Sequence, residues 1–146
     1  MIRPRLILRV LGALMVMVAM AMLFPWAIAL FEGKGEQLGF LIPIVVAIPL
    51  GLFLFFRKKL DRKDEISNRE AFLIATLGWA MAALVAAIPF WIYGSWMHHL
   101  PGKSPFPTFA MAYFESMSGL TTTGSTILND IEALPNSMLF WRYLSH

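Results

Sequence analysis

The chain contains no cysteine among its 146 residues, and charged side chains make up only 14% of it. Without cysteine, disulfide bonds, a cysteine nucleophile and a thiolate metal site are all excluded. The sequence also lacks a P-loop, a glycine-rich dinucleotide motif and a Ser-His-Asp set, so an enzyme is not expected. With 58% hydrophobic residues and a mean hydropathy of +0.66, the chain is too apolar for a soluble domain of this length. The composition predicts an integral membrane protein.

Three stretches carry no charged residue and are long enough to cross a bilayer. They cover residues 10–31 (22 residues), 37–56 (20 residues) and 71–102 (32 residues), the last with its apolar part ending at Gly94. A helix needs about 20 apolar residues to cross a hydrocarbon core of roughly 30 Å. A signal peptide is the alternative for the first stretch, but the usual signal core has only about 7–15 residues.

We therefore predict an all-α membrane protein in which residues 1–56 form two transmembrane helices, at about 6–31 and 38–56, and a third helix covers 71–94. Prolines within these helices, at positions 25, 43, 49 and 89, are expected to mark kinks, which membrane helices tolerate.

Nine of the twelve Lys and Arg residues lie on one side of these helices, either ahead of the first uncharged stretch, 10–31, or between the second and third helices. By the positive-inside rule, the N-terminus and the basic linker 57–70 face the cytoplasm. Acidic residues in the linker largely offset its charge, so a topology signal is favoured over a docking surface, and no nucleic-acid partner is expected.

A helix too short to span follows the third predicted helix. Pro107 and Thr108 predict a start, and Gly119 predicts a stop in the left-handed C-terminal position, giving a helix over 108–118. Eleven residues reach only about 16 Å, half of a crossing. The sequence predicts a re-entrant helix.

The segment "LTTTGST" after this helix has three β-branched threonines and a glycine, so we expect it to be extended or irregular. Non-helical backbone at membrane depth is tolerated only where protein buries it or where it lines a watery cavity. Extended Thr-Thr-Gly would turn carbonyl and hydroxyl oxygens toward one axis, and such oxygens can replace the hydration shell of an alkali ion. The segment "LTTTGST" therefore has two possible roles: it lines a pore, or it packs inside a larger transporter.

The order of an apolar helix, the short helix "FPTFAMAYFESMSG", the loop "LTTTGST" and a new helix containing "FWRYL" resembles a known family. It is similar to the first membrane–pore–membrane repeat of the Trk/Ktr/HKT superfamily of potassium uptake proteins, closest to the bacterial Trk membrane subunit. Two helices ahead of that repeat also resemble the Trk branch. The resemblance implies potassium uptake through a carbonyl-lined selectivity filter at residues 121–126.

By this resemblance the potassium ligands fall on four consecutive residues, mainly through backbone carbonyls: Thr122, which adds its hydroxyl, Thr123, Gly124 and Ser125. Gly119 and Thr121 would support the filter. Glu115 is the one acid in the pore helix, and an intramembrane carboxylate is by default a functional hypothesis. We favour a supporting role for it, through hydrogen bonds to filter amides behind Gly124, over direct ion contact.

Three further charged residues follow the filter. Asp130 and Glu132 can raise the cation concentration at an outer mouth, or can be ordinary solvated acids. Arg142 can be a lone interfacial anchor or the partner of an acid near the outer vestibule.

One filter segment cannot surround an ion, because a ring of about four carbonyl-bearing segments is needed. Residues 71–146 hold one such repeat, and its last helix, 137–146, is too short to span. We expect an N-terminal fragment that does not conduct alone. The alternatives are a small helical membrane adaptor or a subunit of a homotetrameric cation channel.

The resemblance further implies a multi-pass protein of the bacterial inner membrane that contacts the lipid bilayer, forms a homodimer in its full-length form and carries potassium. It also implies a cytoplasmic nucleotide-binding ring subunit as partner, facing the basic linker.

Overall fold

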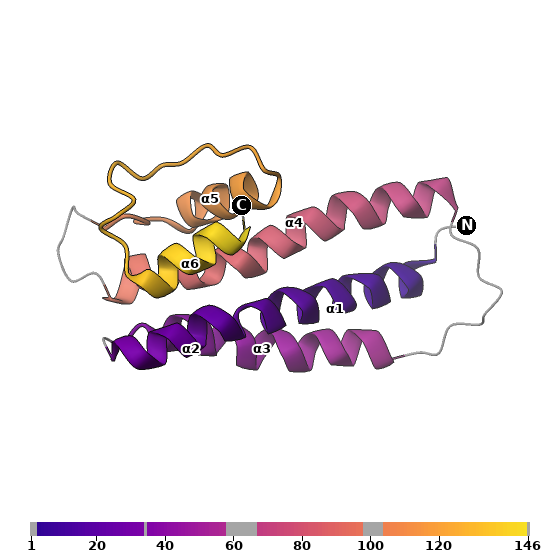
Figure 1. Cartoon of the computed structure of the whole chain (residues 1–146). Helices are drawn as coiled ribbons and strands as arrows, with labels where there is room; N and C mark the ends of the chain where they lie inside the picture. The colour runs from indigo at the N-terminus through magenta and orange to yellow at the C-terminus, as the bar shows by residue number, and fades with distance from the viewer. Residues whose placement is uncertain (1–2, 34, 58–66, 98–103, 146) are drawn as a thin grey trace.

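A computed structural model describes residues 3–33, 35–57, 67–97 and 104–145 (Figure 1). Three helical stretches in these residues, Pro4–Glu32, Gln37–Phe56 and Asn68–Trp96, are long and apolar enough to cross a membrane. The predicted all-α membrane fold is confirmed. The helices are α1 (Pro4–Ala21), α2 (Leu23–Glu32), α3 (Gln37–Phe56), α4 (Asn68–Ile92), the π-helix η1 (Tyr93–Met97), α5 (Phe109–Leu120) and α6 (Asn136–Ser145).

The first predicted helix is divided at Met22 into α1 and α2. Pro25 has no N–H to donate, and its ring clashes with the carbonyl four residues earlier, that of Ala21. The helical hydrogen bonds resume at once, because the Trp26 N–H donates to the Met22 carbonyl oxygen at 3.0 Å. The division is a proline kink within one membrane-length helix.

Helix α4 begins at Asn68, earlier than the predicted residue 71. Its first turn is closed by Glu70, whose carboxylate accepts the Ser67 N–H at 3.1 Å. The same carboxylate pairs with the guanidinium of Arg3, with Nε and Nη2 each 3.0 Å from a carboxylate oxygen. The end of the predicted linker is therefore helical, and its residues 58–66 lie outside the described part of the chain.

At its other end α4 passes into the π-helix η1. The Ser104 hydroxyl donates to the Gly94 carbonyl oxygen at 2.7 Å. A Cβ on Gly94 would lie 2.5 Å from the Phe106 carbonyl oxygen, so only glycine admits this close approach. The π-helical turn, with glycine at position 94, thus lets the segment before α5 pack directly on the end of α4.

Helices α1 and α3 run antiparallel with their backbones in close contact (Figure 1). A Cβ on Gly12 would lie 2.6 Å from the Gly51 carbonyl oxygen, and one on Gly51 would lie 2.7 Å from Val16 Cγ2. Small residues permit this approach between membrane helices, where packing rather than the hydrophobic effect holds helices together.

Helices α5 and α6 both lie beside the half of α4 that is nearer η1, and α6 also contacts α2 (Figure 1). The core between these elements contains large, fully buried side chains, chiefly Phe40, Phe90, Phe106 and Met138. The Phe90 and Phe106 rings lie 5.0 Å apart. This core fixes the position of the two short helices on the longer bundle.

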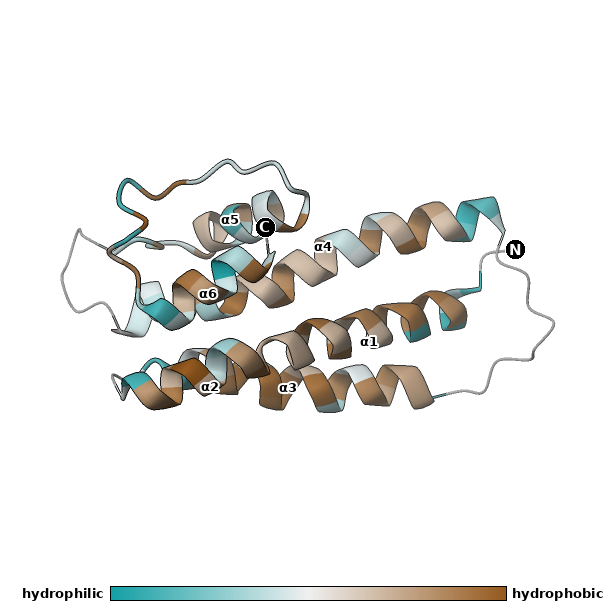
Figure 2. Ribbon diagram, in the orientation of Figure 1, coloured by the Kyte–Doolittle hydropathy of each residue, from teal (hydrophilic) through white to brown (hydrophobic). Residues whose placement is uncertain are grey.

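Many large apolar residues are exposed on the outside of the bundle. Along the helices most residues are hydrophobic, and hydrophilic residues occur mainly near the helix ends (Figure 2). Phe31, Phe56 and Phe72 are 92%, 73% and 76% exposed. In a bilayer these rings contact acyl chains instead of water, which explains why so apolar an exterior is compatible with a folded protein.

The contact between α1 and α3 yields a stability prediction. Gly12→Ala and Gly51→Ala are each expected to lower the free energy of unfolding by about 1–3 kcal/mol, because the added methyl meets backbone or a β-branched side chain. Gly78→Ala is the matched control, since its Cβ would meet only the flexible end of Leu14 at 3.0 Å. Thermal unfolding in detergent compares the stability of the three variants with that of the wild type. Equal losses of stability in all three would contradict the close packing.

Candidate functional site

Helix α5 begins at a cap provided by Thr108, whose hydroxyl oxygen accepts the Met111 N–H at 3.3 Å. Its 12 residues reach about 18 Å, too little to cross a bilayer. The chain then turns back toward the end of the bundle from which α5 began (Figure 1).

The predicted stop of α5 is wrong in detail. Gly119 is helical and buried, α5 extends to Leu120, and the left-handed position is occupied by Thr122, with φ 55°. The Thr122 N–H donates to the Gly119 carbonyl oxygen at 2.8 Å, and the Thr123 N–H to that of Ser118 at 2.9 Å. This pair of bonds is the Schellman arrangement, which usually has glycine where Thr122 stands.

A β-branched residue in the left-handed region is a genuine outlier and costs on the order of 1–3 kcal/mol. Hydroxyl contacts of the neighbouring threonines hold the turn. The Thr121 hydroxyl donates to the Met117 carbonyl oxygen at 2.7 Å and lies 2.9 Å from the Thr123 hydroxyl. The first two threonines therefore close the helix in a turn, and of the two forms expected for this run, extended or irregular, the backbone at its start is irregular.

Gly124 also has a positive φ, 73°, while Thr123 between the two does not. A regular extended strand alternates its two faces residue by residue. A backbone whose φ changes sign at successive residues instead rotates each peptide plane, and this can bring neighbouring carbonyls to one side. All six residues of the segment 121–126 are exposed.

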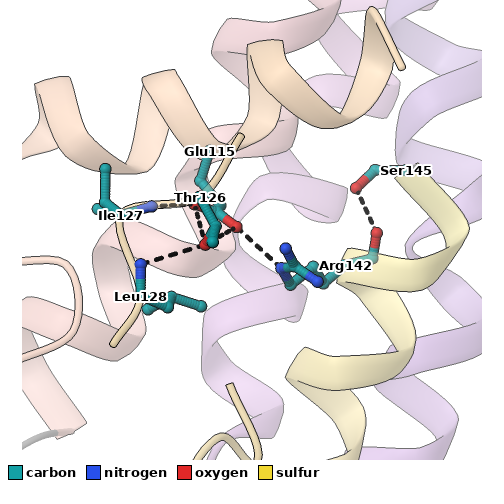
Figure 3. Close-up of polar contacts among 6 residues, drawn as sticks. All are labelled: Glu115, Thr126, Ile127, Leu128, Arg142 and Ser145. Carbon is teal, nitrogen blue, oxygen red and sulfur yellow. Dashed lines mark hydrogen bonds and ion pairs between the residues drawn. The ribbon is translucent and has the colours of Figure 1, made fainter. Parts of the chain in front are cut away.

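Glu115 lies behind this exposed loop and is completely buried. Its carboxylate accepts the Thr126 hydroxyl at 2.9 Å and the Ile127 N–H at 3.1 Å (Figure 3). A third contact comes from Arg142 on α6, whose Nε donates to the carboxylate at 2.8 Å. One side chain therefore joins α5, the chain just beyond Gly124, and α6.

Arg142 is 7% exposed, so the interpretation as a lone interfacial anchor is wrong. Its partner is the acid of the short helix. A buried charge is costly unless it is paired and hydrogen-bonded. The Glu115–Arg142 pair, with the additional hydrogen bonds from Thr126 and Ile127, meets that condition.

Helix α6, which carries Arg142, is fixed by contacts to the first part of the chain. The Trp141 Nε1 donates to the Ala86 carbonyl oxygen of α4 at 3.1 Å, and the Trp141 ring packs edge-on against Phe40 of α3 at 6.4 Å. These contacts hold the middle of α6.

The N-terminus of α6 has no acid in its own first turn. Glu32, at the end of α2, supplies one: its carboxylate accepts the N–H groups of Asn136 at 3.1 Å and Ser137 at 3.2 Å. Glu36, which is buried, accepts the Ser137 hydroxyl at 3.1 Å. An acid at a helix N-terminus satisfies free N–H groups and complements the helix dipole.

The predicted outer-mouth residues do not join this cluster. Asp130 and Glu132 are exposed, and the Asp130 carboxylate accepts the Glu132 N–H at 3.2 Å in a local turn. Their effect on cations stays a prediction. The roles of Thr126, Ile127 and Glu32 were not predicted from the sequence, because their partners lie up to 105 positions away or within irregular backbone.

Comparison with known proteins supports the resemblance seen in the sequence. No family model matches the chain. Over 140 residues, 96% of the chain, it is 35% identical to the Trk system potassium uptake protein TrkH of Escherichia coli K12. The corresponding protein of Halomonas elongata is 34% identical over 138 residues, 94% of the chain. The chain spans 27% of the length of each of these two relatives.

The crystal structure of the potassium transporter TrkH from Vibrio parahaemolyticus matches with a TM-score of 0.78 at 30% identity, covering 97% of this chain and 28% of that one. The resemblance to the Trk membrane subunit is thus confirmed along nearly the whole chain, and the named relatives are transport proteins rather than enzymes.

The buried pair predicts strong coupling between α5 and α6. Glu115→Gln and Arg142→Gln alone are each expected to lower the free energy of unfolding by about 3–5 kcal/mol, because each leaves a buried charge unpaired. The double variant is expected to lose clearly less than the sum of the two. Unfolding in detergent measures the free energy of unfolding of the wild type, the two single variants and the double variant. Arg69→Gln, at an exposed arginine, is the control. Additive losses would show that the two side chains do not interact.

The contact of Glu32 predicts a local effect. Glu32→Ala is expected to accelerate amide hydrogen exchange at the first turn of α6, because the N–H groups of Asn136 and Ser137 lose their acceptors. Glu132→Ala removes an exposed acid and serves as control. Unchanged exchange in the Glu32 variant would contradict the cap.

Proposed function

We propose that this chain, which is similar over nearly its whole length to TrkH proteins, contributes one wall of a potassium-uptake pathway. The observation that carries the proposal is the exposed loop 121–126, held from behind by the buried pair of Glu115 and Arg142. Potassium is the cargo, and backbone carbonyls of Thr122, Thr123, Gly124 and Ser125 would coordinate it together with the Thr122 hydroxyl. Gly119 and Thr121 support this loop at the end of α5.

The alternation of φ from Thr122 to Gly124 supports this assignment, because it can bring successive carbonyls to one side of the loop. The C-terminal end of α5 adds a partially negative dipole at the start of the loop, which favours a cation there. Carbonyl and hydroxyl oxygens are ligands suited to an alkali ion.

Glu115 is assigned a supporting role. It is completely buried and its carboxylate already accepts bonds from Thr126, Ile127 and Arg142. A carboxylate committed to these partners orients the loop instead of replacing water around the ion.

One such segment would have to be joined by about three others to surround an ion, since filters are closed rings of carbonyls. The proposal therefore concerns the protein of which this chain supplies one filter segment, and the 146 residues alone are not expected to conduct.

The proposal includes a placement in the cell. The excess of Lys and Arg at the N-terminal end of α1 and between α3 and α4 favours a cytoplasmic N-terminus in the bacterial inner membrane. A homodimer, and a cytoplasmic nucleotide-binding ring subunit facing the segment after α3, follow from the likeness to the Trk membrane subunit.

Uptake of potassium and rubidium by a potassium-uptake-deficient strain tests the function, using the full reading frame that encodes this chain. Gly124→Ser is expected to abolish discrimination of potassium from sodium, because serine resists the φ of 73° at the loop's turning point.

Gly35→Ser is the matched control: Gly35 has φ 83° and, like Gly124, open space around a new Cβ, but it lies before α3. Loss of selectivity in the Gly124 variant alone supports the filter. Unchanged uptake and selectivity would assign the threonine loop to packing.

A further inference from the structure

A cavity of about 230 Å³ opens between α1 and α3 at the end of the bundle opposite α6. It is lined by Arg5 and Leu8 of α1, Leu54 of α3, and Arg57, the residue that follows α3. Helices α1 and α3 are antiparallel (Figure 1), so the start of α1 lies beside the end of α3. Arg5 and Arg57 are therefore nearest the end of the pair, and Leu8 and Leu54, each three residues away, lie about one turn deeper. The lining is therefore cationic outside and apolar inside.

The two arginines at the mouth differ from their neighbour Arg3. Arg3 is committed to the carboxylate of Glu70. Among the described residues, neither the Arg5 nor the Arg57 side chain has a hydrogen-bond or ion-pair partner, and both residues are exposed. The Arg57 guanidinium lies over the Phe53 ring at 5.2 Å, a contact that leaves its N–H groups available.

A third cation, Arg9, lies on α1 just beyond the residues that line the cavity. The Arg9 guanidinium lies 4.5 Å from the centre of the Phe55 ring, one turn along α1 from Arg5. Among the residues that the structure describes, positive charge is therefore concentrated at this end of the α1–α3 pair, and Glu70, the buried acid nearby on α4, is already paired.

The position of the cavity indicates a ligand with both a charged and an apolar part. Arg5 and Arg57 stand at the ends of two membrane-spanning helices, where side chains meet lipid head groups. Leu8 is 41% exposed and Phe53 57% exposed, so an acyl chain can continue from the cavity along the outside of the helices. A free phosphate would use only the charged mouth and leave the apolar floor unused.

We propose that Arg5, Leu8, Leu54 and Arg57 form a binding site for one anionic phospholipid, with its phosphate between the two guanidinium groups and an acyl chain along the leucines. Arginine suits this task because its planar fork binds phosphate oxygens in pairs and remains charged. Basic pockets between membrane helices are typical sites for anionic head groups. By joining α1 to α3 at this end, the lipid would complement the glycine contact deeper in the pair.

Native mass spectrometry of the protein from its full reading frame tests the site. The protein is reconstituted with phosphatidylglycerol or phosphatidylcholine, and bound lipid is counted after release from the membrane mimic. Wild-type protein is expected to retain one phosphatidylglycerol per chain preferentially. Arg5→Gln and Arg57→Gln are each expected to reduce that preference about fivefold.

Arg69→Gln is the matched control. Arg69 is an exposed arginine in the first turn of α4, at the same end of the bundle as Arg3, and it does not line the cavity. An equal loss in this variant would indicate diffuse attraction and overturn the site. Displacement of the lipid by millimolar inorganic phosphate would also overturn it, since the acyl chain would then contribute nothing. Retention by Leu8→Asn at the wild-type level would contradict the apolar floor.

Discussion

The buried ion pair between Glu115 and Arg142 is the interaction on which the arrangement of the second half of the chain depends. Neither charge is stable alone at membrane depth, because desolvation is costly and a lone member would be left without a counter-charge. Together with Thr126 and Ile127 they satisfy each other. The need to pair these charges therefore brings α5, the threonine loop and α6 to one place.

This pair also stands apart from the loop that it holds. The loop 121–126 is exposed, whereas the groups that hold it are buried behind it. Thr122 sits in a strained left-handed conformation at the end of α5, and such strain persists only where the surroundings enforce it. Here the enforcing contacts are the Schellman bonds to Gly119 and Ser118 and the carboxylate behind Thr126. An irregular backbone is thus held from behind while its residues stay exposed.

Different interactions hold the first half of the chain together. Helices α1 and α3 meet through glycines, since apolar helices in lipid gain little from burying further apolar area. Polar contacts occur at the two ends: Arg3 with Glu70 at one, and Glu32 with the first turn of α6 at the other. The latter contact connects this half to the helix that carries Arg142.

The sequence by itself determined the class of protein, the three spanning helices and the existence of a helix too short to cross. Each of these follows from local composition, such as long uncharged runs and the proline before Thr108. The resemblance to Trk proteins also rested on short contiguous motifs, and for that reason it could be recognised without a structure.

Only the tertiary structure decided which charges meet. Arg142 and Glu115 are 27 positions apart, and Glu32 and Ser137 are 105 apart, so no local pattern links them. The stop of α5 was misplaced for a related reason. Glycine is the usual left-handed residue, but contacts around Thr122 override that preference. Local patterns determine where helices form, whereas long-range pairing of buried charges determines how the loop between them is held.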